Sequence, residues 1–284
     1  MSTLRNITNT YESFQQLIFF YENQKDKLFT DIHLELRQWF AANLSTALGV
    51  ILDSISDLNE IHFDFITHET KQILLKNEFL SYYGFDKVQD NYNTTIKYQK
   101  LKPTDGKFFK TYVVEELLNR DELPEMSIPL REKMIEAIYE IFVNAQIHSD
   151  SEFIYTCGQF FPRKNKIEFT IADNGIGFKE RVNRRFKSNL NAQKAISWAV
   201  QDRNTTKNVT GGIGLALLRE FISKNRGKMQ IISNEGYYEF INGNEYTQEF
   251  QGSFPGTIVN LQFKTDDPKN YLLQSEVKNI NDIF

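Results

Sequence analysis

The order of apolar segments in the second half of the chain constrains its fold most. Two segments with strand patterns, residues 152–161 and 166–173, are joined by the polar turn PRKNK at 162–166, which predicts a β-hairpin. A helical pattern with one apolar face precedes the hairpin at 130–148. Because a helix and a sheet each bury an apolar face, this order predicts a sheet that is covered by helices.

The remaining C-terminal segments extend this sheet. A glycine-led helical pattern at 210–228 ends at Asn225-Arg226-Gly227, and a strand pattern follows at 229–233. Asn242-Gly243 predicts a hairpin turn, because both residues tolerate positive φ. The apolar segment 256–263 is expected to close the sheet.

The first 120 residues have a different pattern. Helical patterns at 10–24, 35–58 and 68–85 alternate with strand patterns at 60–66 and 94–101. This order predicts a small α/β domain with at least one βαβ-like unit.

Two prolines, Pro124 and Pro129, mark the change between the two regions. We therefore predict an N-terminal regulatory or interaction domain at 1–120, a second domain at 121–268 and a tail at 269–284. The predicted fold class is α+β, in which a C-terminal α/β sandwich has a mixed β-sheet with helices on one face.

Charge and cysteine content exclude several kinds of protein. A net charge of −4 argues against broad binding to a nucleic-acid backbone or an anionic membrane, although the basic segment 181–187 could still contact phosphate. The single Cys157, expected in the core, excludes an internal disulfide and a cysteine-based zinc site. The N-terminus has no signal-peptide pattern, and no apolar run is long enough to span a membrane, which predicts a cytoplasmic protein.

Two glycine clusters and one polar helix face are the candidate site. Asp173 ends a predicted strand and is followed by Gly175 and Gly177, which is typical of a turn. The second cluster opens a helix, where free backbone N–H groups and the positive end of the helix dipole suit phosphate. Glu140 and Asn144 lie four residues apart, so they share one face of the helix at 130–148.

Together these elements resemble a known superfamily. In order and spacing, the segments EIFVNAQIH (140–148), DNGIG (173–177), TGGIGL (210–215) and GT (256–257) resemble the N box, the G1 and G2 boxes and the terminal Gly-Thr of the GHKL ATPases. This superfamily contains gyrase-type topoisomerases, the ninety-kilodalton heat-shock chaperone, histidine kinases and MutL. The resemblance covers about half the chain and implies a histidine-kinase-like ATP-binding domain of the Bergerat type.

The resemblance implies ATP and Mg²⁺ as ligands and a role for each motif residue. Asp173 would accept a hydrogen bond from the exocyclic amine of adenine, which guanine lacks at that position. Asn144 would be the magnesium ligand, a neutral oxygen donor beside the phosphates. The other nucleotide contacts that it implies are Gly175 and Gly177 under the base, Gly211, Gly212 and Gly214 at the triphosphate, Lys207 at a phosphate, His148 near the nucleotide, Thr257 near adenine through a water, and Leu215 of the second glycine motif.

The resemblance also suggests a reaction. The segment 178–210 would be a mobile ATP lid, in keeping with its polar, basic and weakly periodic sequence. Glu140 stands where ATP-hydrolysing members and serine kinases of the anti-sigma-factor type carry a general base. Typical histidine kinases lack this glutamate. We therefore expect ATP hydrolysis, with serine/threonine phosphorylation of a partner protein as the first alternative and a non-hydrolysing nucleotide-binding module as another.

The histidine-kinase alternative depends on His33. The segment IHLELRQWF at 32–40 superficially resembles an H-box, but His33 is displaced by one residue and no proline follows, so an ordinary histidine at a helix start is expected. His62 and His68 flank a predicted strand, show no ligand spacing and are expected to be structural.

The N-terminal region suggests how nucleotide state could be transmitted. Its element order and the segment NLSTALGVILDSI at 43–55 resemble the STAS-like domains of bacterial anti-sigma antagonists, which implies a signalling switch with a protein partner. A gyrase-like or MutL-like machine that acts on DNA is the competing class, and we do not expect it, because such machines use a downstream transducer domain and the segment after residue 263 is short. The apolar helix predicted at 10–23 could pair two copies into a homodimer.

Overall fold

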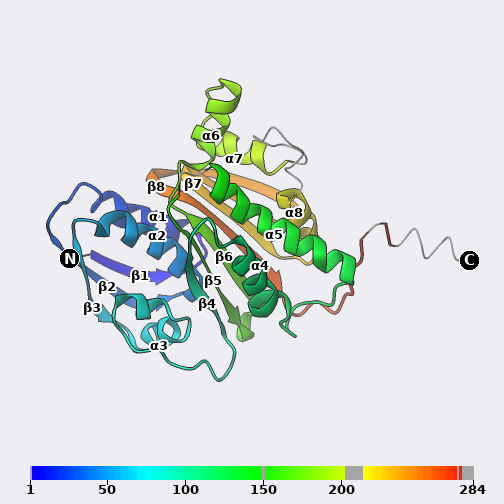
Figure 1. Ribbon diagram of the computed structural model, residues 1–284, viewed down its shortest axis with the longest axis horizontal. Coiled ribbons are helices and arrows are strands. Elements are labelled where there is room, and N and C mark those ends of the chain that lie inside the picture. The colour runs from blue at the N-terminus through cyan, green and yellow to red at the C-terminus, as the bar shows by residue number, and fades with distance from the viewer. Residues whose placement is uncertain (1, 149–150, 202–213, 274, 277–284) are drawn as a thin grey trace, which may run out of the picture.

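A small parallel sheet forms the N-terminal end of the molecule. The computed structural model describes residues 2–148, 151–201, 214–273 and 275–276. In the small sheet the strand order β1-β2-β3 follows the chain, and a helix connects each pair of strands (Figure 1). These elements are β1 (Ser2–Ile7), α1 (Tyr11–Glu22), β2 (Asp31–Phe40), α2 (Ser45–Ser56) and β3 (Glu60–Ile66). The predicted βαβ unit is therefore confirmed, and a second one joins it.

The strand β2 differs most from what the sequence predicts. Residues 35–58 were expected to be helical, with His33 at a helix start, but Asp31–Phe40 is a strand and α2 begins only at Ser45. Ile32, Leu34 and Leu36 are buried, so the alternation of this segment is that of a strand with one covered face. Leu36 and Phe40 also fit helical spacing, which made the segment ambiguous.

Two other N-terminal predictions are corrected. The helix expected over 68–85 is divided into α3 (His68–Lys76) and a short 3₁₀ helix, Phe79–Tyr83, because Glu78 between them has a φ of 66°. β1 was not predicted at all. The helix at 10–24 and the strands at 60–66 and 94–101 are confirmed.

The second sheet has five strands in the order β4-β5-β6-β8-β7. They are β4 (Thr95–Leu101), β5 (Ile154–Phe161), β6 (Lys166–Asp173), β7 (Lys228–Ile241) and β8 (Asn244–Lys264). All four pairings are antiparallel, so the expected mixed sheet is wrong for this part of the chain. The edge strand β4 lies before residue 120, within the region predicted as the N-terminal domain.

Both predicted hairpins of this sheet are confirmed. β5 and β6 pair across the turn at 162–165, and β7 and β8 pair across Asn242-Gly243, whose φ values are 52° and 79°. The segment 256–263 does not close the sheet at an edge, because β8 lies between β6 and β7.

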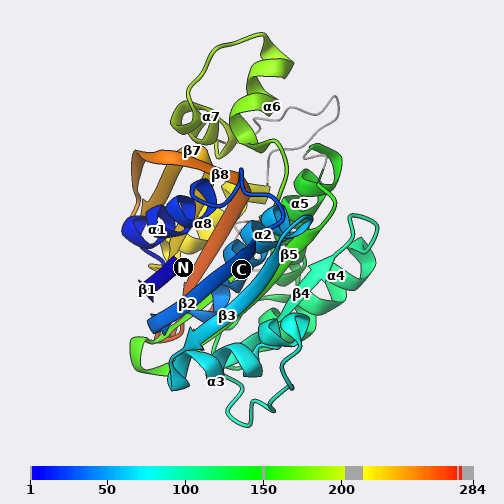
Figure 2. The ribbon, with the colours of Figure 1, turned by 90° about the vertical axis from the view of Figure 1, so that its left-hand side faces the viewer.

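Helices cover both faces of the five-stranded sheet. One face carries α5 (Ile128–His148) and α8 (Gly214–Lys224), with α4 (Gly106–Tyr112) and a π-helical turn, Val113–Leu118, beside them. The other face packs on α1 and α2, so the expectation of helices on one face alone is wrong (Figures 1 and 2). The resulting layers are small sheet, helices, large sheet and helices. No helix within the described ranges is long and apolar enough to cross a membrane.

Two helices occupy the segment after β6. α6 (Gly177–Phe186) and α7 (Ala192–Ala199) lie at one end of the large sheet (Figure 1). Their buried residues include Phe178, Val182 and Ile196, so this segment has the apolar periodicity that the sequence prediction did not recognise.

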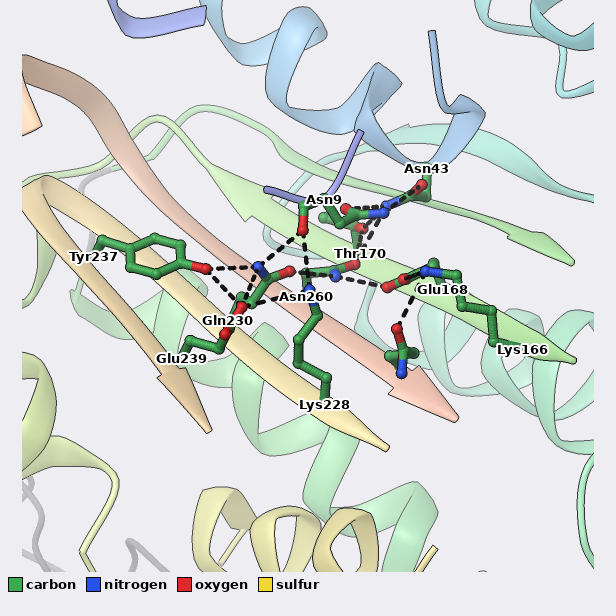
Figure 3. Close-up of polar contacts among 11 residues, drawn as sticks. Asn9, Asn43, Lys166, Glu168, Thr170, Lys228, Gln230, Tyr237, Glu239 and Asn260 are labelled. Atoms are coloured by element: carbon green, nitrogen blue, oxygen red, sulfur yellow. Dashed lines mark hydrogen bonds and ion pairs between the residues drawn. The ribbon is translucent and has the colours of Figure 1, made fainter. Parts of the chain in front are cut away.

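A buried polar network joins the N-terminal elements to the large sheet (Figure 3). Asn43 Nδ2, just before α2, lies 3.0 Å from Thr170 Oγ1 on β6 and 3.2 Å from Asn260 Oδ1 on β8. Asn260 Nδ2 donates to Glu168 and to Gln230, at 2.7 and 3.1 Å. These side chains are buried, so their hydrogen bonds replace the water that they lose on folding.

Candidate functional site

A small cavity of about 20 Å³ lies where α5, the end of β6, α6, the start of α8 and β8 meet. It brings together four predicted site residues: Asn144, Asp173, Leu215 and Thr257. The rest of its lining is Ile141, Ala145, Ile171, Phe178, Arg181 and Val259. The walls are therefore mostly apolar, with a few polar groups that converge on one point, as in small-molecule sites generally.

Asp173 is the buried acid of this cavity. It is the last residue of β6 and lies opposite Thr257 on β8, so the sheet fixes its position. One of its carboxylate oxygens, Oδ1, accepts a hydrogen bond from the Gly175 N–H at 2.8 Å. Burial raises the pKa of Asp173 to about 6, although the Gly175 hydrogen bond and the charge of Arg181 oppose this shift.

The predicted Gly-Thr pair has a structural reason. Gly256 has a φ of 143°, and a Cβ atom there would lie 1.9 Å from the carbonyl oxygen of Asp173. Only glycine therefore lets β8 approach the end of β6 so closely. Thr257 Oγ1 lies 3.1 Å from Ser233 Oγ, and Ser233 Oγ accepts a hydrogen bond from the Phe178 N–H at 2.9 Å.

The two glycines after Asp173 serve different purposes. Gly177 has a φ of 77°, and a Cβ atom there would lie 2.2 Å from Asn234 Oδ1 and 2.7 Å from Ser233 Oγ. The side chains of Ser233 and Asn234 on β7 occupy the space beside Gly177. The expected role of this glycine was to make room for the base of a nucleotide. Gly175 does not share the positive φ of Gly177, and its N–H group instead orients Asp173.

Glu140 contacts the start of α8. Its Oε2 accepts a hydrogen bond from the Gly214 N–H at 2.9 Å, and a Cβ atom on Gly214 would lie 2.7 Å from the same oxygen. A carboxylate at this place is stabilised by the positive end of the helix dipole. Glu140 and Asn144 are half-buried and one turn apart on α5, as predicted, but only Asn144 lines the cavity.

Arg181 and Phe178, both on α6, line the cavity, although the sequence placed them only in the expected ATP lid, with Arg181 in the basic segment that could contact phosphate. The Arg181 guanidinium lies over the Phe178 ring at 5.1 Å. Arg181 is buried, and among the described residues its Nε has no hydrogen-bond partner. Burial lowers the pKa of Arg181, while the charge of Asp173 opposes this. The spacing of Phe178, Arg181 and Val182 on one helix face was the signal that could have indicated them.

Some predicted site residues lie outside the described part of the chain. Lys207, Gly211 and Gly212 lie outside the described residues, and His148 ends α5 with its side chain outside the description. The histidines of the N-terminal region lie far from this cavity in the fold: His33 and His62 are on β2 and β3, and His68 begins α3.

The size of the cavity bears on what it can bind. A volume of about 20 Å³ has room for roughly one water molecule. A purine ring fits only if lining side chains move. Phe178 and Arg181 are the candidates, because they come from a short surface helix and not from the sheet.

Comparison with protein-family models and with curated proteins finds no match to this chain.

Proposed function

We propose that the chain binds ATP with Mg²⁺ at this cavity, hydrolyses the ATP and acts as a nucleotide-dependent signalling switch toward a partner protein. One observation carries the proposal. Asn144, Asp173, Leu215 and Thr257 come from four separate elements, and all four line one cavity. The resemblance to GHKL ATPases implies that each of these residues contacts a nucleotide. If the motifs matched by chance, these residues would not be expected to line the same cavity.

The chemistry of the lining fits an adenine nucleotide. Ile141, Ala145, Ile171 and Val259 offer an apolar surface for a base, and the Asp173 carboxylate is an acceptor for an exocyclic amine. Asn144 supplies the amide oxygen that a hard cation prefers. Glu140, on α5 beside the start of α8, would act as the general base on water, and its bond to Gly214 fixes the orientation of its carboxylate.

Substitution of Asp173 tests the binding site. Asp173→Asn replaces an acceptor oxygen by an amide donor, so ATP affinity measured by calorimetry should fall by about 10–100-fold. The matched control is Asp57→Asn, an exposed residue after α2, which should leave the affinity unchanged. Equal affinity of the wild type for ATP and GTP would contradict the role of Asp173.

Two substitutions on α5 test the reaction. Glu140→Gln keeps the shape of the side chain but removes the proton acceptor, so turnover should fall by about 10²–10⁴-fold while ATP affinity stays near the wild-type value. Asn144→Ala should also weaken Mg²⁺-dependent ATP binding, because it removes a metal ligand. Undiminished turnover in Glu140→Gln would reject the base assignment. If the wild type rapidly transfers phosphate to a serine of a partner protein and Glu140→Gln does not, the protein-kinase alternative is favoured.

A further inference from the structure

A cluster of histidines and carboxylates lies on the open face of the small sheet. Ile32 and Leu34 of β2 point into the core, where they are 2% and 0% exposed. Strand alternation therefore places Asp31 and His33 on the opposite face, beside Glu60 and His62 of β3. Figure 2 shows this face of β2 and β3, which no helix of the described residues covers. The parallel register sets Asp31 directly opposite Glu60, and His33 directly opposite His62.

Three of these side chains have the spacing of metal ligands. His62 Nε2 lies 3.8 Å from Asp31 Oδ1 and 3.7 Å from Glu60 Oε2, and the ligand atoms of all three lie within 4.8 Å of one another. Both distances are too long for hydrogen bonds. They are close to the roughly 3.3 Å that separates two ligands of a tetrahedral ion with bonds of about 2.0 Å.

The charges of the cluster also favour a cation. Asp31 and Glu60 form a directly opposed pair of carboxylates, an arrangement that destabilises a sheet. Within the described part of the chain, neither carboxylate forms an ion pair with Lys or Arg, and His62 is the one basic neighbour of each. A divalent ion between the two carboxylates would turn this repulsion into attraction.

His33 holds His62 in place from the side. The two imidazole rings stack with their centroids 5.2 Å apart and an angle of 21° between their planes. His33 Nδ1 is itself fixed by Asp64, whose two carboxylate oxygens lie 2.9 and 3.0 Å away. The position of His62 is thus set by a neighbour that a carboxylate orients, in the manner of the outer shell of a metal site.

We propose that Asp31, Glu60 and His62 form a binding site for a divalent transition-metal ion, with Zn²⁺ as the representative ion. One imidazole nitrogen and two carboxylate oxygens suit zinc, whereas Mg²⁺ and Ca²⁺ prefer sites made of oxygen alone. Three protein ligands leave at least one coordination position for water. The site is independent of the nucleotide cavity, since its residues come from the small sheet.

Zinc titration of the tag-free, nucleotide-free chain tests this proposal. Isothermal titration calorimetry with ZnCl₂ should show one saturable site that millimolar Mg²⁺ does not displace. His62→Ala should weaken zinc binding by about tenfold or more, and Glu60→Gln should weaken it in the same direction. The Glu60 side chain is 82% exposed and that of His62 is 43% exposed, and unchanged circular dichroism will verify that the variants fold.

One histidine variant serves as the matched control. His68→Ala removes an imidazole outside the cluster and should leave the zinc affinity unchanged. Equal zinc affinity in the wild type and His62→Ala, or no saturable binding by the wild type, would overturn the proposal. ATP affinity measured in parallel keeps this outcome separate from the fate of the nucleotide site.

Discussion

At the scale of single residues, burial sets the ionisation of Asp173. A pKa of about 6 means that the carboxylate form dominates at neutral pH and that protonation begins only slightly below it. Because the folded pKa lies above the ordinary value of 3.8, folding favours the protonated form. The stabilising contribution of Asp173 is therefore fully present below about pH 4 and is lost as the pH rises through about 6.

This ionisation predicts a pH dependence of nucleotide recognition. A protonated carboxyl group loses acceptor capacity, so affinity for the base should fall by about fourfold between pH 7.5 and pH 5.5. Calorimetry with adenosine is the suitable measurement, because adenosine has no phosphate that titrates in this range. Asp173→Asn should abolish the dependence, and an unchanged adenosine affinity across this range in the wild type would contradict it.

Gly177 offers a second test at the residue scale. An alanine there would combine an unfavourable positive φ with contact of its Cβ against Asn234 and Ser233, and should cost about 3 kcal/mol of unfolding free energy. Gly84 is the matched control, since its φ is 83° but a Cβ atom meets nothing within 4 Å. Gly84→Ala should therefore cost only about 1 kcal/mol. Chemical denaturation of both variants measures the difference, and equal losses would show that the contact does not matter.

The sequence predicted part of the site and missed the rest for a physical reason. Asp173, Asn144 and Thr257 could be named because each belongs to a short motif with recognisable spacing. Phe178 and Arg181 could not, because their place at the cavity depends on how α6 packs against the end of β7. Their helical spacing indicates a buried face, but the tertiary structure decides what that face meets.

At the scale of elements, the same limit explains the fold predictions. The β5–β6 hairpin and α5 were predicted because their periodicity and turn residues agree. The segment of β2 was expected to be helical because its apolar residues fit the helical period as well as the strand period. The parallel partners β1 and β3, which make it a strand, are separated from it in sequence by helices. The place of β4 at the edge of the large sheet was likewise missed, because α4 and α5 separate β4 from its partner β5 in the sequence.

The position of α6 leads to a prediction for this element. A cavity of about 20 Å³ cannot take a purine ring unless lining side chains move, and the candidates are Phe178 and Arg181 of α6. Hydrogen exchange of the amides in α6 should therefore change when a non-hydrolysable ATP analogue binds, while exchange in the central strand β6 stays constant. Identical exchange of α6 with and without the analogue, at saturating nucleotide, would show that the base enters without moving this helix.

At the scale of the whole molecule, the N-terminal elements and the large sheet share one interior. α1 and α2 pack on the face of the large sheet that α5 and α8 leave uncovered, and Tyr155 and Cys157 of β5 lie in the same apolar cluster as α2. The buried network around Asn260 crosses this boundary through Asn43 (Figure 3). Both features predict that the two parts unfold together.

Asn260 is the residue through which this coupling can be tested. Its side chain bonds Glu168, Gln230, Thr170 and Asn43, all of them fully buried. Asn260→Ala leaves these groups short of partners and should lower the free energy of unfolding by about 3 kcal/mol. Asn244→Ala, at the exposed start of β8, is the matched control and should change it by less than about 0.5 kcal/mol.

The shape of the unfolding curve distinguishes a shared interior from two separate domains. If the network joins one cooperative unit, thermal unfolding followed by near- and far-ultraviolet circular dichroism should give coincident transitions in the wild type. In Asn260→Ala both should shift together to lower temperature, because the lost bonds belong to both parts. Two resolved transitions, of which only one moves in Asn260→Ala, would mean that the two parts fold independently. The proposed nucleotide site would then belong to a unit that unfolds apart from the small sheet, whereas one transition places the small sheet in the same cooperative unit as β6 and β8, the strands that carry Asp173 and Thr257.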